Sequence, residues 1–97
     1  MNKGQIYDKA FITAFTIDES ALGPDLKYES IPEWDSIGHM ALIAELEDEF
    51  DISMEMDDII DFSSYIKGIE IMKKYDITLW FTFFIGLEDF KKTGKNS

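Results

Sequence analysis

The stretch "EWDSIGHMALIAELEDEFDI", residues 33–52, carries the clearest secondary-structure signal in the chain. Its apolar residues Leu42, Leu46 and Phe50 recur every four positions, as they do along one face of an α-helix. Ser36 is a favoured residue for the N-terminal cap of a helix, and the carboxylate just before it suits the positive end of the helix dipole. The stretch therefore predicts an amphipathic helix from Ser36 to Phe50, with Ser36 as its cap.

Three further segments of the chain have helical periodicity. The first, about residues 5–17, places apolar side chains at intervals of three and four. A short helix is expected at about 57–61. A last helix should run from Ser63 or Ser64 to the lysine pair at 73–74, whose charges suit a helix C-terminus. We therefore predict an all-α fold, a small four-helix bundle with a long first loop and a short third helix.

The first loop, about residues 18–35, contains Pro24 and Pro32, which interrupt helices. A loop of this length with regularly spaced apolar residues is expected to pack on the core rather than to lie free in solvent. Those apolar residues are Leu22, Leu26, Ile31 and Trp34.

Residues 1–76 are expected to form one helical domain, followed by a C-terminal extension over residues 77–97. The extension begins with the very apolar "ITLWFTFFIGL", residues 77–87, and ends in polar sequence. A segment this short cannot span a bilayer, so no transmembrane segment is expected. We expect the apolar part to dock on the bundle or to mediate self-association of an otherwise monomeric chain, with a position on a membrane surface as a further alternative.

The composition restricts the classes of function. The 97 residues are 45% hydrophobic, include no cysteine and carry a net charge of -11. Between Glu33 and Asp61 stand eleven carboxylates and no lysine or arginine. Such a surface repels nucleic-acid phosphates and attracts basic proteins, although acidic residues also serve simply to keep a small domain soluble. The lack of cysteine and of a signal-peptide pattern favours a cytoplasmic protein.

The residues contain partial patterns of a catalytic triad and of a calcium-binding loop, but neither pattern is complete. Asp35, Ser36 and His39 are the ingredients of a catalytic triad, but Asp35 adjoins Ser36 in the chain and is badly placed to orient His39. We therefore expect no catalytic residues, and His39 as an exposed polar residue on the helix surface. Oxygen-bearing side chains two residues apart, as at the start of a calcium loop, stand at Asp51, Ser53, Glu55 and Asp57. The glycine and the final glutamate of that loop are missing, so no metal site is expected.

The sequence "WDSIGHMALIAELEDEFDI", followed by the acidic "DDIIDF" and then by "YIKGIEIMKKY", resembles the acyl carrier protein family over about residues 1–76. In that family the motif is Asp-Ser-Leu, and the serine hydroxyl receives 4'-phosphopantetheine from coenzyme A through a Mg-dependent phosphopantetheinyl transferase. Ser36 matches the modified serine, and Asp35 matches the aspartate that helps the transferase complex to hold its metal. Ile37 replaces the usual leucine.

The resemblance implies a function as well as a site. The chain would carry acyl intermediates as thioesters on the arm at Ser36 and deliver them to partner enzymes of fatty-acid-like or specialised biosynthesis. Ala41 departs from the fatty-acid branch, which usually has glutamate there, and Gly38-His39 looks more like stand-alone carriers of specialised pathways. Acyl-loading and acyl-transfer enzymes with basic docking patches would bind the face formed by Ile37, Met40, Ala44, Glu47 and Asp48.

Two alternatives stay open. An aminoacyl or peptidyl carrier is the nearer one, although such carriers usually have glycines just before the serine motif, where this chain has Glu33 and Trp34. The other is a non-carrier, acidic helical interaction module, in which the helix at 36–50 binds a protein partner and Ser36 is only a cap. The carrier interpretation requires an exposed Ser36, whereas a buried Ser36 would favour the interaction module.

Overall fold

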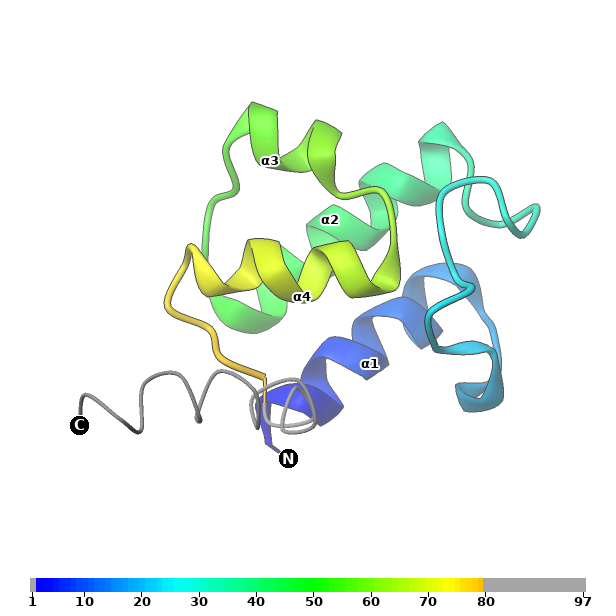
Figure 1. Cartoon of the computed structure of the whole chain (residues 1–97), viewed down its shortest axis with the longest axis horizontal. Coiled ribbons are helices and arrows are strands. Elements are labelled where there is room, and N and C mark those ends of the chain that lie inside the picture. The colour runs from blue at the N-terminus through cyan, green and yellow to red at the C-terminus, as the bar shows by residue number, and fades with distance from the viewer. Residues whose placement is uncertain (1, 80–97) are drawn as a thin grey trace, which may run out of the picture.

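The computed structural model describes residues 2–79, which fold into a small helical bundle (Figure 1). In the view of Figure 1, α3 lies at the top and α1 at the bottom, with α2 and α4 between them. This arrangement confirms the predicted all-α bundle with a long first loop and a short third helix. Its elements are α1 (Lys3–Phe15), the 3-10 turn η1 (Glu19–Ala21), α2 (Ser36–Phe50), α3 (Met56–Asp61) and α4 (Tyr65–Lys73).

The ends of the helices follow from local capping interactions. Helix α1 begins and ends two residues earlier than predicted, because Asn2 and Gln5 form a reciprocal capping box at 2.9 and 3.0 Å. It ends where Thr16 takes the left-handed conformation, with φ of 54°. Ser64, the second of the two predicted caps, starts α4 by accepting a backbone hydrogen bond from Lys67 at 2.9 Å.

Helix α2 spans the predicted residues, but its cap is not the predicted one. The backbone of Asp35 is extended, and its Oδ1 accepts the Gly38 N–H at 2.8 Å. Asp35 is therefore the N-cap and Ser36 is the first helical residue, so the assignment of Ser36 as the cap was wrong. Asp and Ser are equally good caps, and the two stand side by side, so composition could not separate them. In the predicted apolar stripe, Leu42 and Leu46 are buried and Phe50 is partly buried.

The core is built largely from aromatic rings. Phe11 lies at its centre, with ring centroids 5.0 Å from Tyr7, 5.9 Å from Phe15 and 5.6 Å from Trp34. Each of these pairs meets edge to face, which is a favourable geometry for aromatic quadrupoles. The long loop is therefore packed against the helices as predicted, with Leu26 and Trp34 buried and Leu22 and Ile31 partly buried.

The chain continues into the core after α4. Ile77 and Leu79, at the start of the predicted extension, are both buried with the core residues. The rest of the apolar segment at 77–87 and the polar end of the chain lie outside the described residues. None of the helices within residues 2–79 has the length and hydropathy that crossing a bilayer requires.

Candidate functional site

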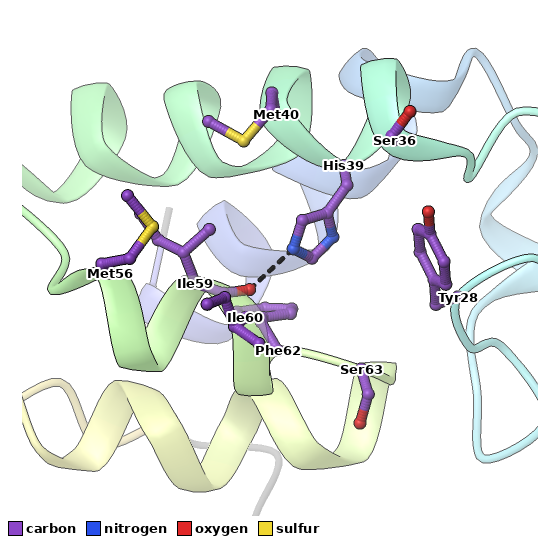
Figure 2. Close-up of a pocket in the computed structure, with 9 residues that line it drawn as sticks. All are labelled: Tyr28, Ser36, His39, Met40, Met56, Ile59, Ile60, Phe62 and Ser63. Carbon is purple, nitrogen blue, oxygen red and sulfur yellow. Dashed lines mark hydrogen bonds between the residues drawn. The ribbon is translucent and has the colours of Figure 1, made fainter.

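Ser36 is exposed at the start of α2 and stands on the rim of a pocket of about 290 Å³ (Figure 2). The pocket lies between α2 and α3, and the loop residue Tyr28 lies at one end of it. Most of its lining is apolar, so it suits an apolar ligand better than a polar one. The lining residues are Tyr28, Ser36, His39, Met40, Met56, Ile59, Ile60, Phe62 and Ser63.

The pocket has two long walls, one formed by α2 and one by α3, and in each wall the lining residues recur at helical spacing. Helix α2 contributes Ser36 and the residues three and four positions later, and α3 contributes Met56 together with Ile59 and Ile60 at the same intervals. Residues at these spacings share one face of a helix, so the two helices turn matching faces toward each other across the pocket. The pattern in α3 was visible in the sequence, but it indicates a pocket only when the position of α2 is known.

His39 joins the two walls. The indole N–H of Trp34 donates to its Nδ1 at 2.9 Å, and its Nε2 lies 2.7 Å from the carbonyl oxygen of Ile59. An indole N–H can only donate and a carbonyl can only accept, so Nε2 carries the proton and donates to Ile59. The prediction of an exposed His39 on the helix surface was therefore wrong. The side chain is half-buried and connects the first loop, α2 and α3.

Both ring nitrogens of His39 are thus bonded to groups other than Ser36, and the carboxylate of Asp35 is bonded to the first turn of α2. The three residues lie near one another in sequence without forming the chain of hydrogen bonds that a triad requires. Within residues 2–79, no group of three or more histidine, aspartate or glutamate side chains is arranged to hold a metal ion.

Gly38 has a steric role at this site. A β-carbon at this position would lie 1.9 Å from the carbonyl oxygen of Glu33, far closer than atoms can approach. Only glycine therefore allows the loop to pass so close to the first turn of α2. This close approach places the loop that carries Asp35 directly against the helix that begins with Ser36.

The predicted partner face is open at four of its five positions. Ile37 is 79% exposed, and Met40, Ala44 and Asp48 are also exposed. Glu47 is half-buried instead, and its Oε2 accepts the Met54 N–H at 2.9 Å. Glu47 therefore stabilises the connection between α2 and α3, and a change there would affect stability as well as the surface.

Two exposed apolar residues beside the pocket were not predicted from the sequence. Met56 and Ile60 are 68% and 71% exposed, and both lie at the mouth of the pocket opposite Met40 (Figure 2). Large apolar side chains seldom cluster on the exposed surface of a soluble protein, and such clusters mark binding surfaces. Their spacing of four residues in a short helix was the available signal.

Comparison with protein-family models, with curated proteins and with solved structures found no match for this chain.

Proposed function

We propose that this chain is an acyl carrier protein that bears 4'-phosphopantetheine on Ser36 and carries acyl groups on that arm. The observation that carries the proposal is the position of Ser36, an exposed hydroxyl at the first residue of a 15-residue helix and on the rim of an apolar pocket. A transferase requires such an accessible hydroxyl. An attached acyl group requires an apolar space within reach, so that it is shielded from water between reactions.

The surroundings of Ser36 suit the group. A phosphodiester on its hydroxyl would lie at the N-terminal end of α2, where the helix dipole favours an anion. Tyr28 and Ser63 line the same pocket, and both carry a hydroxyl, a group that forms hydrogen bonds with a polar arm. The arm would supply a terminal thiol, which holds acyl groups as thioesters and which this cysteine-free chain lacks.

The size of the pocket bears on the cargo. At about 290 Å³ it lies near the lower end of the range of about 300–1,000 Å³ that is typical of small-molecule sites. A pocket of this size favours a short or medium acyl group over a long one. Met40 and Met56 at its mouth are flexible and adapt to different shapes.

The charge distribution supports a docking role. The carboxylates between Glu33 and Asp61 are interspersed in the sequence with the exposed apolar residues of α2 and α3. Attraction to a basic surface speeds association without requiring a permanent complex, as a carrier that visits several enzymes needs. Asp35 keeps its cap bond through Oδ1, and its exposed carboxylate is available to a metal in a transferase complex.

The test is the intact mass of the protein after incubation with coenzyme A, Mg²⁺ and a broad-specificity phosphopantetheinyl transferase. We expect a gain of one phosphopantetheine in the wild type and none in Ser36→Ala. Ser63→Ala is the matched control, because Ser63 is also exposed and lines the same pocket. Modification that persists in Ser36→Ala would refute the site, and no gain with several transferases would refute the carrier function.

A second candidate function is that of an acidic interaction module. It is favoured by the four large apolar residues exposed on α2 and α3, which with the surrounding carboxylates suit a basic, amphipathic partner. Those residues are Ile37, Met40, Met56 and Ile60. If the unmodified wild type and the Ser36→Ala variant bind a basic, amphipathic partner with equal affinity, that result would support this function in place of the carrier.

A further inference from the structure

Helix α3, which forms one wall of the pocket, has little stability of its own. It has six residues, and no side chain caps its N-terminus at Glu55. Isolated helices shorter than about 12 residues are marginal in water, so contacts with the rest of the bundle must hold α3 in place. The width of the pocket therefore depends on those contacts.

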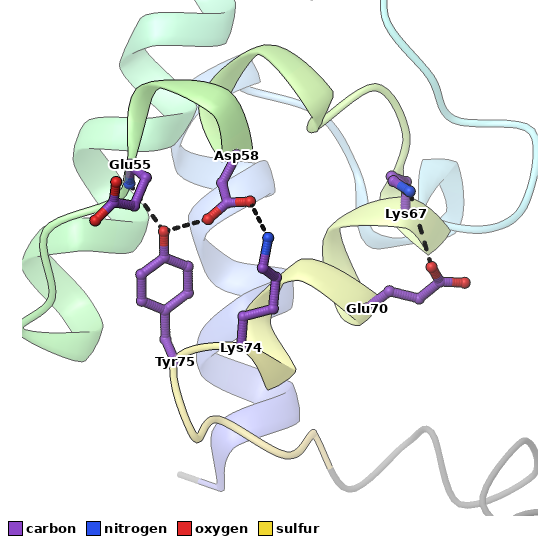
Figure 3. Close-up of polar contacts among 6 residues, drawn as sticks. All are labelled: Glu55, Asp58, Lys67, Glu70, Lys74 and Tyr75. Atoms are coloured by element: carbon purple, nitrogen blue, oxygen red, sulfur yellow. Dashed lines mark hydrogen bonds and ion pairs between the residues drawn. The ribbon is translucent and has the colours of Figure 1, made fainter.

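One of these contacts is a polar cluster between α3 and the end of α4 (Figure 3). Asp58 is only 4% exposed, yet its carboxylate is well paired. Lys74 Nζ donates to its Oδ1 at 2.6 Å, and the Tyr75 hydroxyl donates to its Oδ2 at 2.5 Å. The same hydroxyl accepts the Glu55 N–H at 2.8 Å. The hydrogen bonds from Lys74 and Tyr75 hold the pKa of Asp58 below its usual value, so the carboxylate stays charged and paired.

The cluster and the pocket lie on different sides of α3. Asp58 is two residues from both Met56 and Ile60, which line the pocket, and two residues correspond to about 200° around a helix. Asp58 accordingly points to the end of α4 (Figure 3), and it does not line the pocket. On the pocket side, His39 bonds to the Ile59 carbonyl. Helix α3 is thus attached to α2 on one side and to the end of α4 on the other.

We propose that Asp58, Lys74 and Tyr75 are positioning residues that set the width of the pocket, and that release of this cluster lets α3 move outward and admit apolar ligands more readily. The cluster is suited to this role because Lys74 and Tyr75 follow directly after α4 and reach α3 through their side chains. This inference goes beyond the carrier function, since it concerns the pocket of the unmodified chain.

The variants are Lys74→Met and Tyr75→Phe, each of which removes one partner of Asp58. The side chain of Lys74 is mostly exposed, so its replacement leaves the core intact. Lys74→Arg, which keeps the charge and the donors, is the conservative variant. Lys67→Met is the matched control, because Lys67 lies in α4, the helix that Lys74 follows, and its Nζ forms an exposed 4.0 Å ion pair with Glu70 (Figure 3).

The first measurement is the affinity of the full-length, unmodified chain for N-phenyl-1-naphthylamine, a neutral apolar dye whose binding does not depend directly on the charge of the protein. A hydrogen bond to a charged group shifts a local equilibrium by about tenfold or more, and apparent affinity follows the population of the competent state. We therefore expect about tenfold tighter dye binding in Lys74→Met and Tyr75→Phe. Lys74→Arg and Lys67→Met should bind as the wild type does.

The second measurement is amide hydrogen exchange, which separates local opening from general destabilisation. The Ile59 amide, bonded to the Glu55 carbonyl, should exchange about tenfold faster in the two variants, while the His39 amide in α2 should be unchanged. Equal dye affinity in all proteins, or exchange that accelerates equally in α2 and α3, would overturn the proposal. Neither measurement requires modification of Ser36, so both can be interpreted even if the protein proves not to be a carrier.

Discussion

Replacement of Asp35 by alanine tests the local structure on which the site is built. Its Oδ1 accepts the Gly38 N–H at 2.8 Å and is the side-chain cap of α2. Loss of an N-cap typically costs about 1 kcal/mol, and in a domain of this size about 1 kcal/mol lowers the melting temperature by roughly 4–8 °C. We therefore expect Asp35→Ala to lower the free energy of unfolding by about 1 kcal/mol and the melting temperature by roughly 4–8 °C.

Two companion variants make the prediction specific. Asp35→Asn keeps a carbonyl oxygen for the Gly38 N–H and should retain most of the stability, because Asn and Asp are equally good caps. Ser36→Ala removes an exposed hydroxyl from the first helical residue, and alanine is a better helix former, so the change should stay within about 0.5 kcal/mol. A sequence-based assignment of Ser36 as the cap predicts the reverse order.

Thermal and urea denaturation followed by circular dichroism measure all three variants. If Ser36→Ala destabilises the protein as much as Asp35→Ala, or if Asp35→Ala has no effect, the reasoning from the cap geometry is refuted. The same set separates structure from function. If the charge of Asp35 helps a transferase to hold Mg²⁺, the Asp35→Asn variant should fold normally but accept phosphopantetheine more slowly than the wild type. Equal modification rates in Asp35→Asn and the wild type would show that the aspartate is only a cap.

Three further predictions concern packing, pH and docking. Gly68→Ala should destabilise the protein by about 2 kcal/mol in denaturation, because the new β-carbon would lie 2.2 Å from both the Phe62 ring and the Tyr7 hydroxyl, and this clash outweighs the helical preference for alanine. The pKa of Asp58 is below its ordinary value of 3.8, so its stabilisation is complete above that value and is lost as pH falls through the folded pKa. The stability difference between the wild type and Asp58→Asn should therefore shrink in acid, and a difference that is constant with pH would contradict the ion pair. Asp48→Lys should slow loading by a basic partner enzyme several-fold at low salt and much less at high salt, with unfolding changed by less than about 0.5 kcal/mol, and salt-independent loading would remove its role.

The helices were predictable because their signals are local. The four-residue spacing of Leu42 and Leu46 and the lysines at the end of α4 fixed the type and approximate position of these elements. Errors were confined to the ends, where short-range choices between neighbouring residues decide. The capping box between Asn2 and Gln5 moved α1 by two residues, and Asp35 took the cap that Ser36 was expected to form.

Much of the candidate site was also visible in the chain. Ser36 was placed at the start of a helix, and its observed exposure is what the carrier interpretation requires. Ile37, Met40 and Ala44 were expected on the exposed face and are open. These follow from helical periodicity, which decides which side chains point away from the core. Glu47 shows the limit of that reasoning, because its position on the helix did not reveal its bond to the Met54 amide.

What the sequence by itself determined is the set of helices, the acidic surface and the accessible Ser36, since each depends on residues within a few positions of one another. Only the tertiary structure decided that α2 and α3 enclose a pocket beside that serine, that His39 reaches the Ile59 carbonyl, and that Asp58 is buried against Lys74 and Tyr75. The partners in these contacts are 16 to 20 residues apart in the chain. No local pattern specifies such pairs, because they form only when packing of the apolar core fixes the helices relative to one another.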